Sequence, residues 1–199
     1  MKTLGVFSIL LFLFLKFQIS TEKYEYNADH FQESIELFEN RDFIYNCNRH
    51  MLGSITIKGT YQIFKDSLIL NSSPQRDKII VREKNTGKFE NKVFKVTDKY
   101  GNLRTFHLYV TLNDYSKKIF KDCYDEIKFK SKPIKSFHII YTDGLKSPEY
   151  NLEGSYTNLF EIQFETARVF DNENWYINDS KIQPKGFDGE NQKYYLTKR

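Results

Sequence analysis

The stretch that most clearly predicts the fold is Gly59-Thr60-Tyr61-Gln62-Ile63-Phe64-Lys65-Asp66-Ser67-Leu68-Ile69-Leu70-Asn71-Ser72. Apolar and polar residues alternate on both sides of the polar turn 65–67, as in an antiparallel hairpin with one buried face. Tyr61, Leu68 and Leu70 are therefore predicted to point inward. Gly59 lies on the same face, where a missing side chain marks a bulge or a close approach of another backbone.

Alternating segments also precede this hairpin. After a polar lead-in at residues 21–29, short strands are expected at 34–37, 43–47 and 54–63, separated by polar turns. Strands joined in this way form an up-and-down antiparallel sheet, so residues 21–75 are predicted to be a β-meander. The residues expected to face its core are Ile35, Leu37, Phe43, Tyr45, Cys47, Ile55, Ile57 and Ile63.

The character of the chain changes after Ser72-Ser73-Pro74-Gln75, which is the best candidate for a domain boundary. Further strands are expected at 78–83, 93–97, 105–112, 125–130, 136–141 and 159–165. The segment Tyr115–Tyr124 has helical spacing, which indicates a single helical turn or an irregular crossover. A last strand at 192–197 is expected to pair with these strands, because a free Tyr-Tyr-Leu edge invites aggregation.

Two resemblances follow from these segments. Residues 34–37, 43–45, 59–61 and 66–72 resemble a pattern common in exported Bacteroidetes proteins of undefined function. Residues 78–166 resemble the carboxypeptidase-regulatory-like, or transthyretin-like, β-sandwich, and the likeness lies in segments 94–102, 133–141 and 156–162. It implies an Ig-like sandwich without catalytic residues. We therefore expect an all-β chain, with an antiparallel meander at 21–75 and a transthyretin-like sandwich with C-terminal strands at 76–199.

The N-terminal segment indicates export. Lys2 precedes an almost wholly apolar run from Leu4 to Phe17, which matches the hydrophobic region of a secretory signal peptide and is short for a membrane span. Residues 1–20 are therefore predicted to be a signal peptide, and the mature protein to be periplasmic or extracellular in a bacterial envelope. No membrane contact is expected beyond this segment. The alternative is an uncleaved N-terminal anchor.

Export makes a disulfide between Cys47 and Cys123, the two cysteines of the chain, a candidate feature. A bridge of this span would stabilise the fold by about 3–5 kcal/mol in the chain-entropy model. The alternative is two buried thiols that never meet, because sequence does not place the two Cα atoms within bridging distance.

The composition excludes several classes of protein. Aromatic residues make up 17% of the chain, and aromatic side chains suit half-buried strands better than a helical bundle. The 30 basic and 26 acidic residues alternate along most segments, whereas a nucleic-acid-binding protein gathers its basic residues on one face. No nucleic-acid partner is therefore expected.

No constellation of residues predicts catalysis. The histidines at 30, 50, 107 and 138 include one metal-like spacing, Cys47-Asn48-Arg49-His50, and no second pair accompanies it, so no metal site is expected. Oxygen-rich turns at 98–102 and 171–173 lack the spacing of a calcium loop. No phosphate-binding glycine loop or nucleophile motif is present, and no cofactor is expected. The scattered carboxylates leave a carboxylate-dependent hydrolase open as an alternative.

The aromatic residues supply the candidate binding sites. Tyr109, Tyr141, Trp175 and Tyr176 include several that alternate away from the predicted core, and exposed Tyr and Trp give large contact areas at low entropic cost. The alternative is that these residues belong to covered faces of the sheets. The sequence thus favours a non-enzymatic binding or structural module of the envelope, with a protein or glycan partner. A small-ligand carrier is the alternative if the meander closes into a barrel with a cavity.

Overall fold

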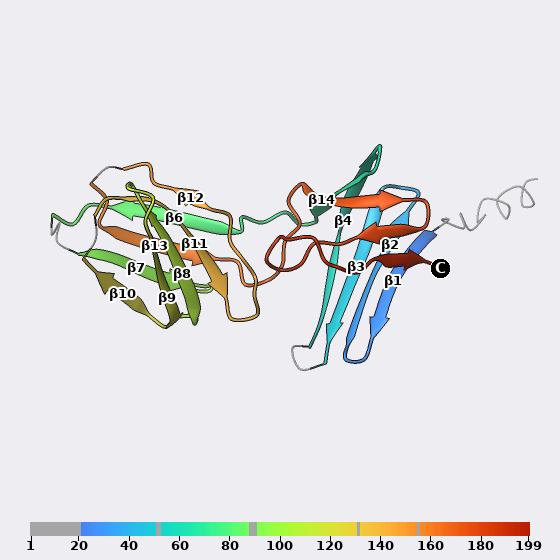
Figure 1. Cartoon of the computed structure of the whole chain (residues 1–199), viewed down its shortest axis with the longest axis horizontal. Coiled ribbons are helices and arrows are strands. Elements are labelled where there is room, and N and C mark those ends of the chain that lie inside the picture. Colours follow the sequence, from blue (N-terminus) through green and yellow to red (C-terminus); the bar gives the residue numbers. More distant parts are fainter. Residues whose placement is uncertain (1–20, 51–52, 88–90, 131, 155) are drawn as a thin grey trace, which may run out of the picture.

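The computed structural model describes residues 21–50, 53–87, 91–130, 132–154 and 156–199. These residues form two β-sheet bodies that lie side by side along the long axis of the molecule (Figure 1). The all-β class predicted from the sequence is confirmed. No helix within the described ranges has the length and hydropathy needed to cross a membrane. The predicted signal peptide, residues 1–20, lies outside the described residues.

The first body is a closed barrel of eight antiparallel strands in the order β1-β16-β15-β14-β5-β4-β3-β2. The meander predicted from the sequence supplies its N-terminal strands, and the polar lead-in at residues 21–29 contributes β1, because pairing with β2 and β16 orders it. The barrel strands are β1 (Thr21–Ala28), β2 (Phe31–Phe38), β3 (Asp42–Arg49), β4 (Gly53–Phe64), β5 (Ser67–Ser72), β14 (Glu173–Asn178), β15 (Lys181–Gln183) and β16 (Leu196–Lys198).

The second body is a β-sandwich inserted between β5 and β14 of the barrel. Its two four-stranded sheets have the orders β10-β7-β13-β6 and β12-β11-β8-β9. The pair β13–β7 is parallel and the other pairs are antiparallel. The sandwich strands are β6 (Ile79–Lys84), β7 (Lys92–Thr97), β8 (Phe106–Leu112), β9 (Lys117–Cys123), β10 (Glu126–Phe129), β11 (Ile134–Tyr141), β12 (Tyr150–Asn151) and β13 (Leu159–Phe164).

The C-terminal strands belong to the barrel and not to the sandwich. β16 pairs with β1 through Tyr24 and Lys198, and with β15 through Ile182 and Leu196, so the expected pairing of the last strand with the sandwich is wrong. Edge protection correctly predicts that this strand is paired. It does not identify the partner, which here is the first described strand of the chain.

Each body has its own hydrophobic core. The predicted inward positions Phe43, Tyr45 and Cys47 of β3 are at most 2% exposed, and Leu68 and Leu70 of β5 are fully buried. In the barrel, Phe170 and Trp175 pack edge-on against Tyr45, so aromatic rings fill the interior. The sandwich core confirms the alternation predicted for β8 and β13. Its buried members there are Phe106, Leu108, Val110, Leu112, Phe160, Ile162 and Phe164.

Gly59 is the position where the barrel wall admits no side chain. It pairs with Phe43 on one side and Ser72 on the other. A Cβ atom at Gly59 would lie 1.9 Å from the carbonyl oxygen of Asn71 and 2.8 Å from the Phe43 ring. The close backbone approach predicted from the sequence is confirmed.

The segment with helical spacing, Tyr115–Tyr124, contains a strand. Residues 117–123 form β9, which pairs with β8 through Tyr109 and Ile119. The expected helical turn or irregular crossover is therefore wrong, because pairing with β8 supplies backbone hydrogen bonds over most of the segment, whereas a short, weakly capped helix is marginally stable.

Cys47 and Cys123 are both free thiols. Cys47 is buried in the barrel core, whereas Cys123 packs against the sandwich core. The candidate disulfide is not formed in this structure, in which the two cysteines belong to separate cores.

Candidate functional site

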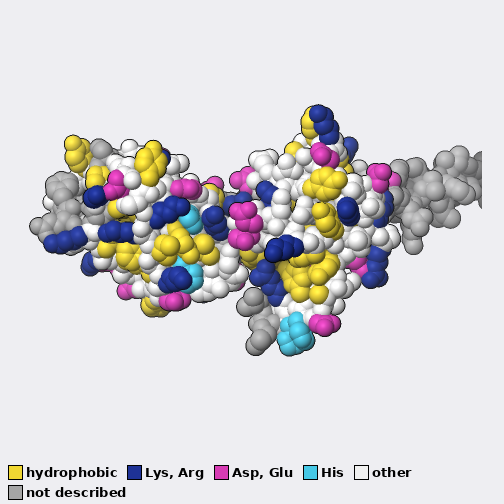
Figure 2. Space-filling view, in the orientation of Figure 1, with side chains coloured by type: hydrophobic (Ala, Val, Ile, Leu, Met, Phe, Trp, Pro, Cys, Tyr) yellow, Lys and Arg dark blue, Asp and Glu magenta, His cyan; other side chains and the backbone are white. Residues whose placement is uncertain are grey.

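A pocket lined by charged and aromatic side chains opens at the end of the barrel that faces the sandwich. It has a volume of about 440 Å³, and we call it the mouth pocket. Charged side chains of both signs gather where the two bodies meet (Figure 2). The side chains of the mouth pocket used below are Phe31, Glu33, Tyr45, Cys47, Arg49, Asp143, Arg168, Lys185, Phe187, Asp188, Gln192 and Tyr194.

Strand alternation brings the barrel side chains into this pocket. Tyr45, Cys47 and Arg49 are successive inward positions of β3, and Glu33 of β2 lies directly opposite Cys47. The inward series therefore begins in the apolar core and ends with a guanidinium at the barrel rim. The pocket is the place where this apolar series becomes polar.

Glu33 is the buried carboxyl group of the pocket, with 3% of its surface exposed. Its Oε1 accepts a hydrogen bond from the Tyr45 hydroxyl at 2.8 Å, and its Oε2 accepts one from the Tyr194 hydroxyl. Burial raises the pKa of Glu33, because a charged carboxylate loses hydration there, and the two hydroxyls together with Arg168 and Arg49 only partly oppose this. Glu33 thus retains its proton to a higher pH than an exposed glutamate.

Arg168 is the buried cation of the pocket, with 6% of its surface exposed. Its Nη2 donates hydrogen bonds of 2.7 Å to Glu173 Oε1 and to the Lys185 carbonyl oxygen. Its guanidinium carbon lies 4.8 Å from the Phe170 ring centroid and 5.1 Å from that of Phe187. Burial alone would lower the pKa of Arg168, but Tyr45, Glu173 and Glu33 outweigh it, so its pKa is raised. Arg168 is permanently charged.

The segment between β13 and β14 carries Arg168 into the barrel. Two residues further on, Phe170 is fully buried in the barrel core. The Phe170 amide donates to Ser72 Oγ at 2.8 Å, and the Ser72 amide donates to the Phe170 carbonyl at 2.9 Å. The two segments that connect the bodies are therefore tied together at the barrel, which fixes the position of Arg168.

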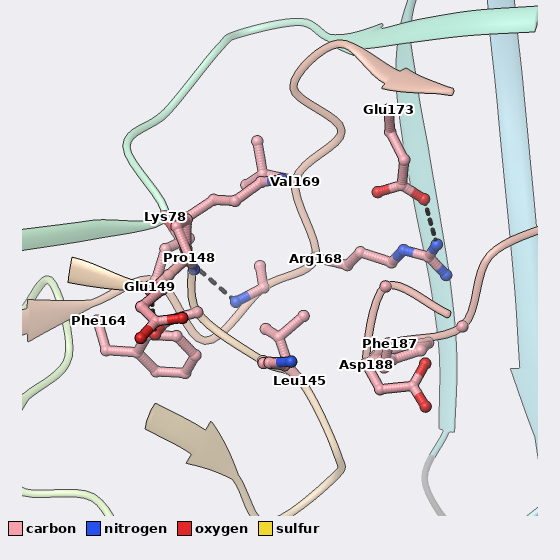
Figure 3. Close-up of a pocket in the computed structure, with 16 residues that line it drawn as sticks. Lys78, Leu145, Pro148, Glu149, Phe164, Arg168, Val169, Glu173, Phe187 and Asp188 are labelled. Carbon is pink, nitrogen blue, oxygen red and sulfur yellow. Dashed lines mark hydrogen bonds and ion pairs between the residues drawn. The ribbon is translucent and has the colours of Figure 1, made fainter. Parts of the chain in front are cut away.

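A second depression, of about 330 Å³, continues from the mouth pocket between the two bodies. Leu145 and Phe164 of the sandwich line one side of it, and Arg168 and Phe187 line the other (Figure 3). Figure 3 shows Arg168 extending from its segment toward Glu173. Phe187 packs against both hydrophobic cores, so this residue joins the barrel to the sandwich.

The chemistry of the mouth pocket favours binding. Burial raises the pKa of the Cys47 thiol, which keeps it protonated and weakly nucleophilic. Burial likewise raises the pKa of Tyr45 and of Tyr194, so both phenols stay neutral hydrogen-bond donors. Within the described residues, no histidine lines this pocket, and no group of three or more His, Cys, Asp or Glu side chains is arranged to hold a metal ion.

The structure disperses the four aromatic residues predicted as binding residues. Tyr109 lies on β8 and stacks on His138, with ring centroids 4.8 Å apart. Tyr141, at the end of β11, is half-buried and packs against Phe164. Tyr176, on β14 of the barrel, is 40% exposed. These residues lie on different bodies and do not form one site.

Trp175 is fully buried, and its Nε1 donates to Glu173 Oε1 at 2.8 Å. The expectation that its ring faces a partner at the surface is wrong, because β14 turns this side chain into the barrel core. Trp175 and Arg168 both donate to Glu173 Oε1, so the two residues share one acceptor. Its indole is therefore next to the mouth pocket without lining it.

The residues of the mouth pocket were not identified as a site from the sequence, although part of the signal is present there. Glu33 is in phase with the inward residues Ile35 and Leu37, and Arg49 is in phase with Tyr45 and Cys47. A charged residue at a core-facing position indicates a buried polar site. Arg168 gives no such signal, since it lies in a connecting segment without alternation.

Comparisons of the chain with protein-family models, curated proteins and solved structures gave no match. The functional argument therefore depends on the geometry of the mouth pocket.

Proposed function

We propose that this chain is a non-enzymatic binding module that holds a small ligand in its mouth pocket. The observation that carries the proposal is the buried cluster of Glu33, Tyr45 and Arg168 at the inner end of an open pocket. Buried polar groups that converge on a pocket with aromatic walls are typical of ligand sites. Buried titratable groups with shifted pKa values also concentrate at functional sites.

The barrel supports this proposal. Barrels of eight strands are wide enough to hold one small ligand, usually at or below the mouth. In this barrel Phe43, Tyr45, Phe170 and Trp175 fill the interior, so the space for a ligand lies at the end that faces the sandwich. This is the small-ligand carrier among the functions considered from the sequence, with its site moved from the barrel interior to the mouth.

The hydrolase alternative has less support. Both oxygens of Glu33 accept hydrogen bonds from phenol hydroxyls, and Glu173 is paired with Arg168 and Trp175. A general acid or base needs an oxygen directed at the substrate or at a water molecule. In this cluster, the carboxyl groups of Glu33 and Glu173 accept hydrogen bonds from neighbouring protein side chains instead.

The cellular setting remains part of the proposal. The apolar N-terminal segment supports export to a bacterial envelope, and the two four-stranded sheets of residues 79–164 are compatible with a transthyretin-like sandwich. An envelope glycan is a second candidate partner, favoured by the row His138, Tyr109 and Ile119 across β11, β8 and β9. Affinity electrophoresis in gels that contain envelope polysaccharides tests this surface. The polysaccharide should retard the parent protein, and Tyr109→Ala should lose this retardation.

The single tryptophan provides a test of the mouth pocket. A panel of small acids, amines and neutral aromatic compounds is titrated while Trp175 fluorescence is recorded. We expect at least one compound to bind saturably. Gln192→Phe, which places a ring in the pocket, should abolish that binding, whereas Asn191→Phe at the adjacent exposed position should retain it. Absence of saturable binding for every compound, or equal binding by both variants, refutes the proposed function.

A further inference from the structure

Arg49 is the cation at the rim of the mouth pocket. Its guanidinium carbon lies 3.8 Å from the centroid of the Phe187 ring. Its Nη1 makes one long hydrogen bond, 3.4 Å, to the carbonyl oxygen of Asp143 in the sandwich. Stacking on Phe187 fixes the plane of the guanidinium. A polar contact with the Cys47 thiol engages a further N–H group, and the remaining N–H groups stay available in that plane.

Lys185 is a second cation of the pocket. Its carbonyl oxygen accepts a hydrogen bond from Arg168, which places the residue beside the buried cluster. Among the described residues, no carboxylate lies within ion-pair distance of the Arg49 guanidinium or the Lys185 ammonium. Two cations thus meet in one pocket without a direct counter-ion.

Each acidic group of the pocket accepts at least one hydrogen bond from the protein. Glu33 accepts from two phenols. Asp143 Oδ1 accepts from the Leu145 amide at 2.9 Å, and Asp188 Oδ1 accepts from the Glu190 amide at 3.0 Å. These aspartates stabilise their own turns, so the direct ion pairs that would neutralise Arg49 and Lys185 are missing from the pocket.

We propose that the mouth pocket binds a small organic anion whose carboxylate or phosphate group contacts Arg49 and Lys185, and whose apolar part packs on Phe31 and Phe187. This inference rests on the proposed function and names its ligand class. A planar guanidinium with free N–H groups can donate two parallel hydrogen bonds to such an oxyanion. Phe31 and Phe187 are partly buried rings on the wall of the same pocket.

Four probes of one shape and different charge test the ligand class: benzoate, phenyl phosphate, benzyl alcohol and benzylammonium. Binding is measured by calorimetry and by Trp175 fluorescence. We expect the two anions to bind at least about tenfold more tightly than the neutral and cationic probes, since a charged hydrogen bond contributes on the order of 1.5 kcal/mol or more. Raising the salt concentration should weaken the binding of the two anions and of no other probe. The relative affinities of benzoate and phenyl phosphate distinguish the two kinds of oxyanion.

Substitutions assign the effect to the two cations. Arg49→Gln and Lys185→Gln should each weaken benzoate binding, Arg49→Gln by about tenfold, and leave benzyl alcohol unaffected. Arg41→Gln is the matched control, because Arg41 also lies over a ring, that of Tyr61, but at the opposite end of β3. Melting temperatures establish that each variant is folded.

The outcomes separate the ligand class from the pocket itself. Benzyl alcohol or benzylammonium binding as tightly as benzoate overturns the inference and leaves the proposed function in place. Benzoate affinity that is unchanged in both glutamine variants also overturns it. Absence of binding by all four probes and by every compound of the wider panel overturns the proposed function and the inference together.

Discussion

The barrel and the sandwich place their buried polar side chains differently. In the sandwich such groups close loops: the buried Asp98 accepts hydrogen bonds from the amides of Tyr100 and Asn102, and the partly buried Glu83 accepts from the amides of Glu153 and Gly154. The core between the two sheets is apolar. In the barrel, charged side chains instead enter the end of the core and line a pocket.

The difference indicates where stability and function conflict in this molecule. Loop-closing carboxylates satisfy backbone donors and stabilise the structure around them. A buried ionic cluster costs several kcal/mol of lost hydration for each ion, which its internal contacts only partly offset. The barrel therefore tolerates at its mouth an arrangement that the sandwich core avoids, and this supports a binding role for the cluster.

The largest effect is expected from removing the buried cation. Arg168→Met leaves Glu173 without its ion-pair partner, and it removes one of the two cations near Glu33, so that Arg49 alone remains. Removing one member of a buried ion pair typically costs about 3–5 kcal/mol. Denaturant unfolding followed by Trp175 fluorescence reports on the barrel, since the single tryptophan lies in its core.

The control for Arg168→Met is an ion pair of the sandwich. Lys84 and Glu161 lie 2.7 Å apart, with 51% and 37% of their side chains exposed. Lys84→Met should cost less than about 1 kcal/mol, because solvent screens exposed pairs. Equal and small effects of the two substitutions would show that the barrel cluster is no more demanding than a surface pair.

A smaller effect is expected at Gly59. In Gly59→Ala the new methyl group meets the Asn71 carbonyl oxygen at 1.9 Å, so β4 and β5 must separate. Such overpacking of a closed wall should cost about 3 kcal/mol. Gly87 of the sandwich is the contrasting position, with φ +73° and no other atom within 4 Å of an added Cβ. Gly87→Ala should cost about 1 kcal/mol, from backbone strain alone. A Gly59→Ala melting curve that matches the parent would contradict the close approach.

Local patterns predict much of both bodies but not how the barrel closes. Alternation over two or three residues suffices to predict that Phe43, Tyr45 and Cys47 point inward, because strand side chains alternate between faces. Closure depends on the pairing of Tyr24 with Lys198, and on that of Leu68 with Trp175. No local signal distinguishes a final strand that completes a barrel from one that extends a sandwich, since either arrangement pairs the backbone groups of that strand.

The site was less predictable than the fold for a related reason. Glu33 and Arg49 carry a local signal, a charge in phase with apolar residues. Arg168 lies in a segment without periodicity. Its burial depends on the packing of Phe170 in the barrel core against residues that are distant in sequence, such as Tyr45. The cluster requires all three residues, so the pocket is recognisable only in the folded structure, where the segment after β13 places Arg168 in the barrel.

The smallest effect expected is a pH dependence that has opposite signs in the two bodies. Burial raises the pKa of Glu33 above its ordinary 4.5, so the folded barrel keeps this proton at a pH where the unfolded chain has lost it. The unfolded state then binds fewer protons, and the contribution of Glu33 to stability falls as pH rises from about 4.5 through the raised pKa. Glu33→Gln removes this loss, so its stability relative to the parent should increase from pH 5 to pH 8 in denaturant titrations.

Glu161 on β13 of the sandwich provides the opposite case. A hydrogen bond from Lys84 lowers the pKa of Glu161, so its contribution is present above pH 4.5 and disappears as pH falls through the lowered pKa. Glu161→Gln should therefore lose stability relative to the parent above pH 4.5, and the difference should vanish in acid. The same trend for both variants would mean that the Glu33 carboxyl is ionised and well solvated in the folded protein. In that case the mouth pocket would be wetter than its hydrogen bonds indicate, and an anion would compete there with a charged Glu33.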